Sequence, residues 1–309
     1  MGRAFLRSKG DDIVRIFMTG ATGFIGSALV PELIQAGHQV LGLTRSEAGA
    51  ERLQKAGAEV LRGNIEDLEN LRAGAAKSDG VIHLAFNHDF SQLLRNCEDD
   101  RNAIEAMGEV FLDSNRPLVM TSAIGVLANV DGKLLTEDSP IASWNPRGAS
   151  EVTVKELAAR GVHTSVVRLP QVHNTVKQGF VTALVETARR KGVSAYPGEG
   201  LNSWSAAHIS DVAQLYRLAF EKAEAGAIYH AVDEEGVTMK AIAEAIGRSL
   251  QLPAISVPAE ESETHFGWLG RCAGHDMSAS GTLTQQRLNW KPAGPGLISD
   301  LDQLDSTRA

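Results

Sequence analysis

Cysteine is scarce in this sequence, which argues against a disulfide-stabilised fold and against a fold built around a cysteine-ligated zinc ion. The two cysteines among 309 residues, Cys97 and Cys272, lie far apart, and neither belongs to a C-x-x-C motif. We therefore expect two thiols in a reducing compartment, with neither a disulfide framework nor a cysteine-based zinc site. There is also no H-E-x-x-H motif and no cluster of histidines and cysteines at metal-ligand spacing, so no metal site is predicted.

Long apolar runs and an excess of positive charge are missing as well. No apolar run approaches the roughly 18 residues of a membrane-spanning helix. Residues 1–12, MGRAFLRSKGDD, lack the apolar core of a signal peptide, so we expect a disordered leader and a cytoplasmic location. With 30 basic and 38 acidic residues the net charge is −8, which argues against nucleic acid as a partner.

What the sequence does contain is a regular alternation of apolar runs and helical patterns. Strands are predicted at 13–19, 39–44, 59–62, 80–85, 117–122 and 163–169, and helices at 24–36, 47–56, 66–73, 91–113 and 148–160. The connections are short, so the pattern predicts an α/β fold with a doubly wound, Rossmann-like parallel sheet and helices on both faces. Ligands of such sheets bind at the carboxyl edge of the strands.

The strongest motif is TGATGFIG at residues 19–26, which directly follows the first apolar strand and opens the first helix. Gly20 allows a tight turn, Gly23 lets backbone N–H groups approach a phosphate, and Gly26 lets helix and strand pack closely. The helix N-terminus would hold the pyrophosphate of a dinucleotide. A tight structural turn is the alternative.

Several further motifs follow in a fixed order: GVIHLA at 80–85, TSA at 121–123, VVRLPQVHN at 166–174, AAHISDVA at 206–213 and LNWKP at 288–292. Together with the G-x-x-G-x-x-G spacing they resemble the extended or atypical branch of the short-chain dehydrogenase/reductase superfamily, the NAD-dependent epimerase/dehydratase-like proteins. The resemblance covers nearly the whole chain. It implies an NAD(P)-binding Rossmann domain at 13–175 and a small, mainly substrate-binding lobe at 176–309, with residues 205–232 returning to the Rossmann core.

Arg45 directly follows the second predicted strand, at the position where an acidic residue would bind the ribose 2′-hydroxyl of NAD. A guanidinium suits a 2′-phosphate, so we expect NADP(H) rather than NAD(H), although a solvated Arg45 or one stacked on adenine is the alternative. The resemblance implies that the remaining cofactor contacts come from the glycine loop and from the carboxyl ends of later strands. These residues are Thr22, Phe24, Ile25, Asn64, Ile65, Ala85, Phe86, Thr121, Pro170 and Val172.

Members of this superfamily usually carry Tyr-x-x-x-Lys on the helix after the fifth strand, together with a serine. The resemblance places Ser122 at the serine, Lys155 at the lysine, where it would also bind the nicotinamide ribose, and Glu151 at the tyrosine. A glutamate is a much stronger acid than a tyrosine, with reference pKa values of about 4.3 and about 10. Glu151 is therefore expected to act as a base, as an orienting carboxylate or, if buried and protonated, as an acid, and a plain i,i+4 ion pair with Lys155 is the structural alternative.

Other side chains are weaker candidates for substrate contact. His88 follows the fourth strand, and His173 falls where the superfamily often has a tyrosine, so either is a candidate proton donor. Tyr196 and Trp204 flank a Pro/Gly-rich stretch that should form the substrate wall. Each of these residue types is more often structural than catalytic.

The sequence thus predicts an NADP(H)-dependent oxidoreductase that transfers a hydride to or from a small organic carbonyl, alcohol, imine or enone. A non-catalytic NADP(H)-binding sensor and an NAD-dependent sugar-type epimerase or dehydratase are the alternatives. By family analogy, the helices after the fourth and fifth strands are expected to form a homodimer face.

Overall fold

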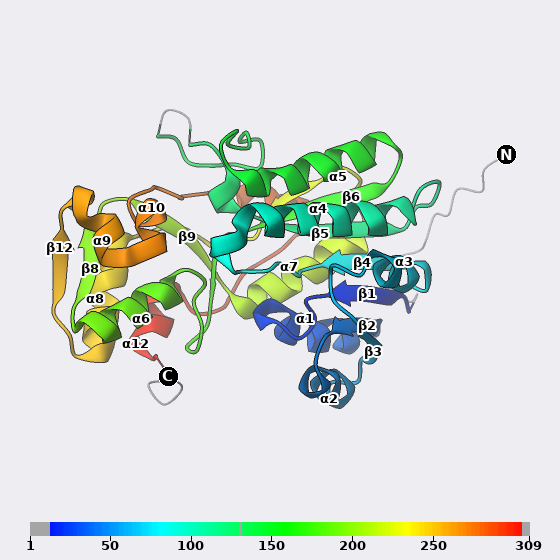
Figure 1. Ribbon diagram of the computed structural model, residues 1–309, viewed down its shortest axis with the longest axis horizontal. Coiled ribbons are helices and arrows are strands. Elements are labelled where there is room, and N and C mark those ends of the chain that lie inside the picture. The colour runs from blue at the N-terminus through cyan, green and yellow to red at the C-terminus, as the bar shows by residue number, and fades with distance from the viewer. Residues whose placement is uncertain (1–12, 130–131, 305–309) are drawn as a thin grey trace.

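A computed structural model describes residues 13–129 and 132–304 (Figure 1). The predicted disordered leader, residues 1–12, lies outside the described residues. The central sheet of the described chain has seven parallel strands in the order β10-β6-β5-β4-β1-β2-β3, which confirms the predicted fold class. Its strands are β1 (Arg15–Thr19), β2 (Gln39–Thr44), β3 (Glu59–Arg62), β4 (Gly80–His83), β5 (Pro117–Ala123), β6 (His163–Leu169) and β10 (Ile228–His230).

Helices cover both faces of this sheet because successive strand residues point to opposite sides. In β1, Ile16 and Met18 pack towards helices α1 (Phe24–Gln35) and α7 (Ile209–Lys222), whereas Phe17 packs on the other side. That other side carries α3 (Leu68–Ala76), α4 (Leu93–Glu109) and α5 (Ala149–Ala159). Helix α2 (Glu47–Lys55) connects β2 to β3. Parallel order places every carboxyl end of the strands along one edge.

A second, smaller core lies beyond that edge, at the left of Figure 1. It contains a three-stranded sheet, β11-β9-β7, and a two-stranded sheet, β12-β8. Its elements are β7 (Gln171–His173), α6 (Val181–Lys191), β8 (Ser194–Pro197), β9 (Ser203–His208), β11 (Glu234–Thr238), α8 (Met239–Leu250), β12 (Ala254–Val257), α9 (Ser262–Phe266), α10 (Gly270–Ala273) and α12 (Leu297–Asp302). Helix α11 (Thr282–Leu288) contacts α7 and β10.

Residues 205–232 cross between these two regions. They leave β9, form α7 against α1, and end in β10, which pairs with β6 in the central sheet. Short 3₁₀ turns complete the chain at Phe90–Gln92 (η1), Ile124–Val126 (η2), Pro146–Gly148 (η3), Ala259–Glu261 (η4) and Gly267–Leu269 (η5). Within the described ranges, no helix has both the length and the apolar character needed to cross a membrane.

Candidate functional site

The glycine loop lies between β1 and α1 at the carboxyl edge of the sheet. Gly20 has a φ of +66°, and a Cβ added there would lie 2.8 Å from the backbone nitrogen of Ala85. A Cβ on Gly26 would lie 2.2 Å from the carbonyl oxygen of Gly20. Both positions therefore require glycine. Gly20 needs it for its positive φ, and at both positions a Cβ would collide with neighbouring backbone atoms. The first turn of α1 carries no acidic side chain, so its N-terminus can accept a phosphate.

Arg45 follows β2 and is exposed, and it has no hydrogen-bonding or ion-pair partner among the described residues. Its neighbour Arg62 is already engaged, because it donates to the Ser46 carbonyl at 2.6 Å and pairs with Glu47 at 3.1 Å. Arg45 is thus the guanidinium at this corner that remains available for a ligand. The side-chain oxygen of Asn64 accepts from two backbone N–H groups, those of Glu66 and Asp67, both at 3.0 Å, so it shapes the turn before α3.

A buried polar network joins the end of β1 to the start of α5. The hydroxyl of Thr19 lies 2.7 Å from Nδ1 of His83, and Nε2 of His83 lies 3.1 Å from a carboxylate oxygen of Asp100. The other carboxylate oxygen accepts from the hydroxyl of Ser150 at 2.5 Å and from the guanidinium of Arg147. If Nε2–H donates to the carboxylate, Nδ1 accepts from Thr19, whose oxygen then accepts the backbone N–H of Ala85 at 3.2 Å.

Asp100 is the charge on which this network depends, since its side chain is fully buried. Burial alone would raise the pKa of this carboxyl, but Arg147, His83 and Ser150 outweigh burial and hold the pKa below its ordinary value. Asp100 is therefore an ionised, fully hydrogen-bonded anchor for the guanidinium of Arg147.

Arg147 brings a positive charge to the carboxyl edge of β4 and β5. Besides its contact with Asp100, it donates to the carbonyl oxygen of Thr121 at 3.0 Å. Its guanidinium carbon lies 4.0 Å from the centre of the Phe86 ring, so the planar cation covers that ring. Sequence reasoning missed Arg147, although it stands four residues before Glu151, which is the spacing of Tyr-x-x-x-Lys.

Glu151 does not pair with Lys155, although the two stand one turn apart on α5. Glu151 is fully buried and accepts two hydrogen bonds from Arg168 of β6, at 3.0 and 2.8 Å, whereas Lys155 is exposed. Arg168 also donates to the carbonyl of Glu137 at 3.0 Å and lies 3.3 Å from Nε2 of His230. The structural alternative, an i,i+4 ion pair between Glu151 and Lys155, is therefore wrong, because Arg168 holds the Glu151 carboxylate.

Ser122 lies beside this cluster, in register with Arg168 on the neighbouring strand. Its side chain is 3% exposed, and its hydroxyl has no hydrogen-bond partner in the part of the chain that the structure describes. The hydroxyl of Thr121, in contrast, donates to the carbonyl of His83 at 2.7 Å and lies 2.8 Å from that of Tyr216. A buried, unpaired hydroxyl is costly to keep, which makes Ser122 available to a bound ligand.

His88 lies on the exposed loop after β4, between the rings of Phe86 and Phe90. Partial burial and the positive charges of Lys177 and Arg147 lower the pKa of His88 below its ordinary value. The histidine is therefore neutral at neutral pH, in a positively charged environment.

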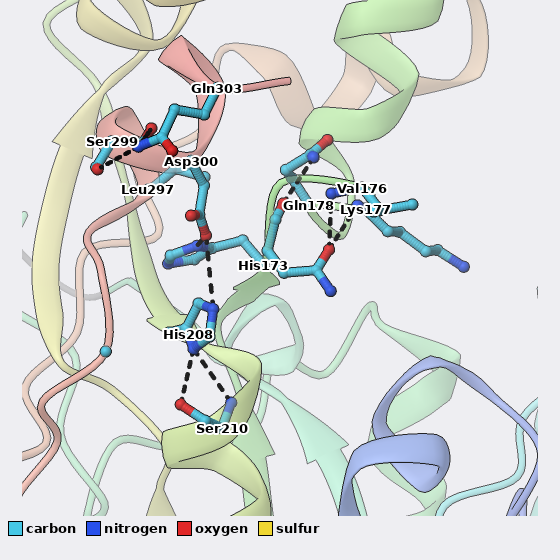
Figure 2. A network of polar contacts seen from close by, with 12 residues as sticks. His173, Val176, Lys177, Gln178, His208, Ser210, Leu297, Ser299, Asp300 and Gln303 are labelled. Atoms are coloured by element: carbon cyan, nitrogen blue, oxygen red, sulfur yellow. Dashed lines mark hydrogen bonds and ion pairs between the residues drawn. The ribbon is translucent and has the colours of Figure 1, made fainter. Parts of the chain in front are cut away.

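His173 is hydrogen-bonded to Asp300 in the second core and not to a group of the proposed cofactor site. Figure 2 shows His173 and His208 converging on Asp300 of α12, and Nδ1 of His173 lies 2.7 Å from its carboxylate. Burial lowers the pKa of His173 despite this carboxylate, so the ring is neutral and fastens α12 to β7. The other two candidates also belong to the second core: Trp204 is fully buried with its indole N–H on the His275 carbonyl, and Tyr196 is half-buried.

The segment after β7 supplies a cation that sequence reasoning missed. The amino group of Lys177 lies 5.7 Å from the centre of the Phe24 ring, in the first turn of α1, and it has no ion-pair partner among the residues described. In Figure 2 its side chain points away from the contact between His173 and Asp300. Of the other predicted cofactor residues, Pro170 joins β6 to β7, and Val172 lies within β7 and is part of the core. The described residues contain no group of metal-binding side chains.

Comparisons with known proteins agree with this geometry. The model of the NAD dependent epimerase/dehydratase family matches residues 16–233. An uncharacterized protein of Schizosaccharomyces pombe is 49% identical over 290 residues, which are 93% of this chain and 98% of that protein. The 4-hydroxy-2-methyl-3-oxo-4-farnesyl-3,4-dihydroquinoline-1-oxide ketoreductase of Stigmatella aurantiaca is 26% identical over 271 residues, covering 82% of this chain and 80% of that protein.

Among solved structures, the dTDP-glucose 4,6-dehydratase DesIV of Streptomyces venezuelae, determined with NAD bound, has the same fold. It superposes with a TM-score of 0.75 at 19% identity and covers 94% of this chain and 95% of its own. The predicted resemblance is thereby confirmed, and with it the prediction of an NAD(P)-dependent enzyme.

Proposed function

The chain belongs to the NAD dependent epimerase/dehydratase family, and from this premise we propose that it is an NADP(H)-dependent oxidoreductase acting on a small organic carbonyl or alcohol. The observation that carries the proposal is the meeting of three features at one sheet edge. These are a glycine loop that excludes any Cβ, the unpaired hydroxyl of Ser122 and the anchored guanidinium of Arg147. The ketoreductase relative from Stigmatella aurantiaca favours the same reaction class.

The residues present fit a dinucleotide. Gly20 and Gly26 allow the turn to pack closely on the chain around it, which sets the N-terminus of α1 where a pyrophosphate would bind, and Lys177 lies beside that turn. The free guanidinium of Arg45 suits a 2′-phosphate, which is why we propose NADP(H) over NAD(H). When bound, such a cofactor supplies or accepts the hydride.

The chain's own side chains then handle charge and protons. Ser122 donates a hydrogen bond to the reacting oxygen of the substrate, and Arg147 stabilises negative charge on that oxygen. A guanidinium stays protonated throughout the working pH range, so Arg147 cannot replace a tyrosine as proton donor. We propose that Arg147 and Glu151 stand at the tyrosine and lysine positions of the family motif, and that the proton comes from water or through His88.

A second candidate function is that of a non-catalytic NADP(H)-binding sensor. The observation favouring it is that neither Arg147 nor the buried Glu151 can perform the acid–base chemistry of the tyrosine and lysine. An epimerase or dehydratase that keeps NAD bound needs the same acid–base chemistry and is less well supported. Protein that still contains tightly bound NAD⁺ after purification would favour the epimerase or dehydratase.

A hydride-transfer assay separates these functions. Wild-type protein and the Ser122→Ala variant are mixed with NADPH and a panel of carbonyl, imine and enone compounds, and the loss of nicotinamide absorbance is followed. We expect turnover with a carbonyl compound that falls about tenfold or more in Ser122→Ala with little change in NADPH affinity. Dinucleotide binding without turnover on any compound would support the sensor.

We also propose a homodimer formed through α4 and α5. Leu94 on α4 is 75% exposed and Val152 on α5 is 47% exposed, so each helix presents an apolar side chain to solvent. Light scattering on wild type and Val152→Glu tests the proposal, which predicts a dimer converted to monomer by the new charge. A monomeric wild type would refute it.

A further inference from the structure

A row of aromatic rings leads from Arg147 to the surface of the second lobe. We call it the aromatic strip and define it as Phe86, His88, Phe90, Phe180 and Trp268. Neighbouring ring centres lie 5.5 Å apart for Phe86 and His88, 6.0 Å for His88 and Phe90, and 4.7 Å for Phe90 and Trp268. Phe180 closes the group at 5.9 Å from Phe90 and 5.5 Å from Trp268.

Three segments that are distant in sequence build this strip. Phe86, His88 and Phe90 come from the loop between β4 and α4, Phe180 from the N-terminus of α6, and Trp268 from η5. The strip therefore spans the Rossmann region and the second lobe, outward from the carboxyl edge where the reaction is proposed. Its inner end is fixed, since the Arg147 guanidinium covers the Phe86 ring.

Exposure distinguishes the strip from an ordinary aromatic core. Trp204, whose ring centre lies 6.5 Å from that of Phe180, is fully buried, and its indole N–H is hydrogen-bonded. Trp268, in contrast, stacks on Phe90 at an interplanar angle of 20° and stays 49% exposed. A stacked aromatic pair that leaves half of a tryptophan in water keeps apolar area available to a ligand, which is a common mark of a binding surface.

The charges around the strip indicate what it accepts. Arg147 and Lys177 supply positive charge at its inner end, and there burial first, and then these two charges, lower the pKa of His88. The neighbouring carboxylate of Asp89 is turned into the start of η1, accepting from the N–H and hydroxyl of Ser91 at 3.1 and 2.6 Å. A ligand here meets ring faces along its length and hydrogen-bond donors at one end.

On the basis of the proposed function, we propose that the aromatic strip is the substrate subsite and that the substrate is a planar, apolar carbonyl compound, aromatic or polycyclic. The planar ring system of the substrate packs against the aromatic side chains of the strip, because aromatic rings favour offset-stacked and edge-to-face contacts with π systems. Its carbonyl oxygen points to Ser122 and Arg147. A nucleotide sugar would instead need cations for its diphosphate along the outer half of the strip, where the structure has Phe90, Phe180 and Trp268.

The test compares three probes on cofactor-loaded protein: naphthaldehyde as the planar probe, decalone as a saturated bicyclic ketone, and UDP-glucose. Binding is measured by calorimetry for wild type, Trp268→Leu and Phe90→Leu. The matched control is Trp144→Leu, because Trp144 is 69% exposed and belongs to no ring contact of the strip. Circular dichroism confirms that each variant is folded.

We expect wild type to prefer naphthaldehyde over decalone and over UDP-glucose, and both strip variants to lose about tenfold or more in naphthaldehyde affinity, roughly the effect of 1.4 kcal/mol. Trp144→Leu should bind like wild type. Wild-type affinity for naphthaldehyde in both Trp268→Leu and Phe90→Leu would overturn the proposal, as would a preference of the wild type for UDP-glucose. If the strip variants only lower the melting temperature, the rings are a contact between lobes and the proposal also fails.

The same samples separate this proposal from the proposed function. NADPH binding is measured first and should be unchanged in Trp268→Leu. A wild type that binds no dinucleotide would refute the oxidoreductase itself, whereas normal NADPH binding with no role for Trp268 and Phe90 would refute the strip alone.

Discussion

Arg147 is the residue on which the proposed chemistry depends most. In the proposed assignment, its permanent positive charge takes the place of the family's proton donor, and Asp100, Ser150 and Thr121 fix its orientation. Preorganised charge of this kind stabilises an oxyanion without having to reorganise during the reaction. The site would therefore rely on electrostatic stabilisation rather than on proton transfer from a side chain.

The first prediction concerns this charge. Arg147→Gln keeps a hydrogen-bond donor but removes the cation, so we expect kcat/KM for the best carbonyl substrate to fall about 10²-fold with NADPH affinity nearly unchanged. The control is Arg101→Gln, which removes a guanidinium from a pair with Glu105 on the exposed side of α4. Equal activity in the two variants would show that Arg147 has no part in the reaction.

The second prediction separates Glu151 from Lys155. Glu151→Gln leaves the buried guanidinium of Arg168 without its counter-charge, so we expect a loss of about 3–5 kcal/mol in the free energy of unfolding. Lys155→Gln, on the exposed face of the same helix, should change it by less than about 0.5 kcal/mol. Urea unfolding measures both, and a Lys155 variant as unstable as the Glu151 variant would contradict the structure.

These residues also show what sequence reasoning could not reach. Glu151 and Lys155 have the required i,i+4 spacing, and so do Arg147 and Glu151, so the pattern alone does not choose between two registers one turn apart. Burial favours the register we propose, because Glu151 is buried, Arg147 is partly buried and Lys155 is exposed. Arg168, which fixes Glu151, lies on another strand and carries no local signal of the contact.

At the scale of elements, the Rossmann half is largely predictable. The expected strands at 39–44, 59–62 and 163–169 match β2, β3 and β6 in both bounds, because buried parallel strands are apolar runs between turn residues. The second lobe is not predictable in this way. Its strands β7, β8 and β12 have three or four residues, too short for a periodic signal.

Strand β9 shows the physical reason. Its partners are β7 and β11, and Trp204 within it also bridges to Met277, so its conformation depends on segments up to 73 residues away. Contacts over such distances leave no trace in the local sequence. The prediction of function was less affected, since the glycine loop and the motifs at 80–85 and 121–123 lie in the Rossmann half.

The third prediction tests the packing of α1 against the glycine loop. Gly26→Ala puts a methyl group on the carbonyl of Gly20, so the helix must move and the phosphate site with it. We expect about tenfold or weaker NADPH binding and a loss of roughly 1–3 kcal/mol in the free energy of unfolding. Gly274→Ala is the control, because a Cβ there meets no atom within 4 Å. Unchanged NADPH affinity in Gly26→Ala would contradict the proposed phosphate site.

At the scale of the whole molecule, buried histidines connect the C-terminal third to the sheet. His230 of β10 is fully buried, with Nδ1 3.0 Å from the Ser280 carbonyl and Nε2 3.3 Å from the guanidinium of Arg168. The neutral ring donates to the carbonyl and accepts from the arginine. A protonated ring would bring a second positive charge against Arg168.

The fourth prediction follows from this arrangement. Burial, together with the charge of Arg168, lowers the pKa of His230 from 6.5 to about 4. The unfolded chain therefore takes up a proton at a higher pH than the folded chain, so this contribution to stability is present above pH 6.5 and is lost as the pH falls towards 4. His230→Gln keeps a donor and an acceptor without titrating.

Urea unfolding at about pH 7 and about pH 5 checks this claim. Wild type should lose more stability between the two values than His230→Gln does, and the difference reports His230 because other titrating groups are shared. Identical pH dependence in the two proteins would show that His230 titrates normally in the fold.

The central claim is that this chain is an NADP(H)-binding enzyme of its family, and an equilibrium titration with NADPH and with NADH tests it most directly. Wild type should bind NADPH more tightly than NADH, and Arg45→Ala should lose that preference while keeping NADH binding. Lys177→Ala should weaken the binding of both cofactors by a similar factor, since its amino group lies 5.7 Å from the Phe24 ring, in the turn where we propose that the pyrophosphate binds. Tighter NADH binding by wild type would contradict the role of Arg45, and folded, cofactor-free protein that binds neither dinucleotide would contradict the account as a whole.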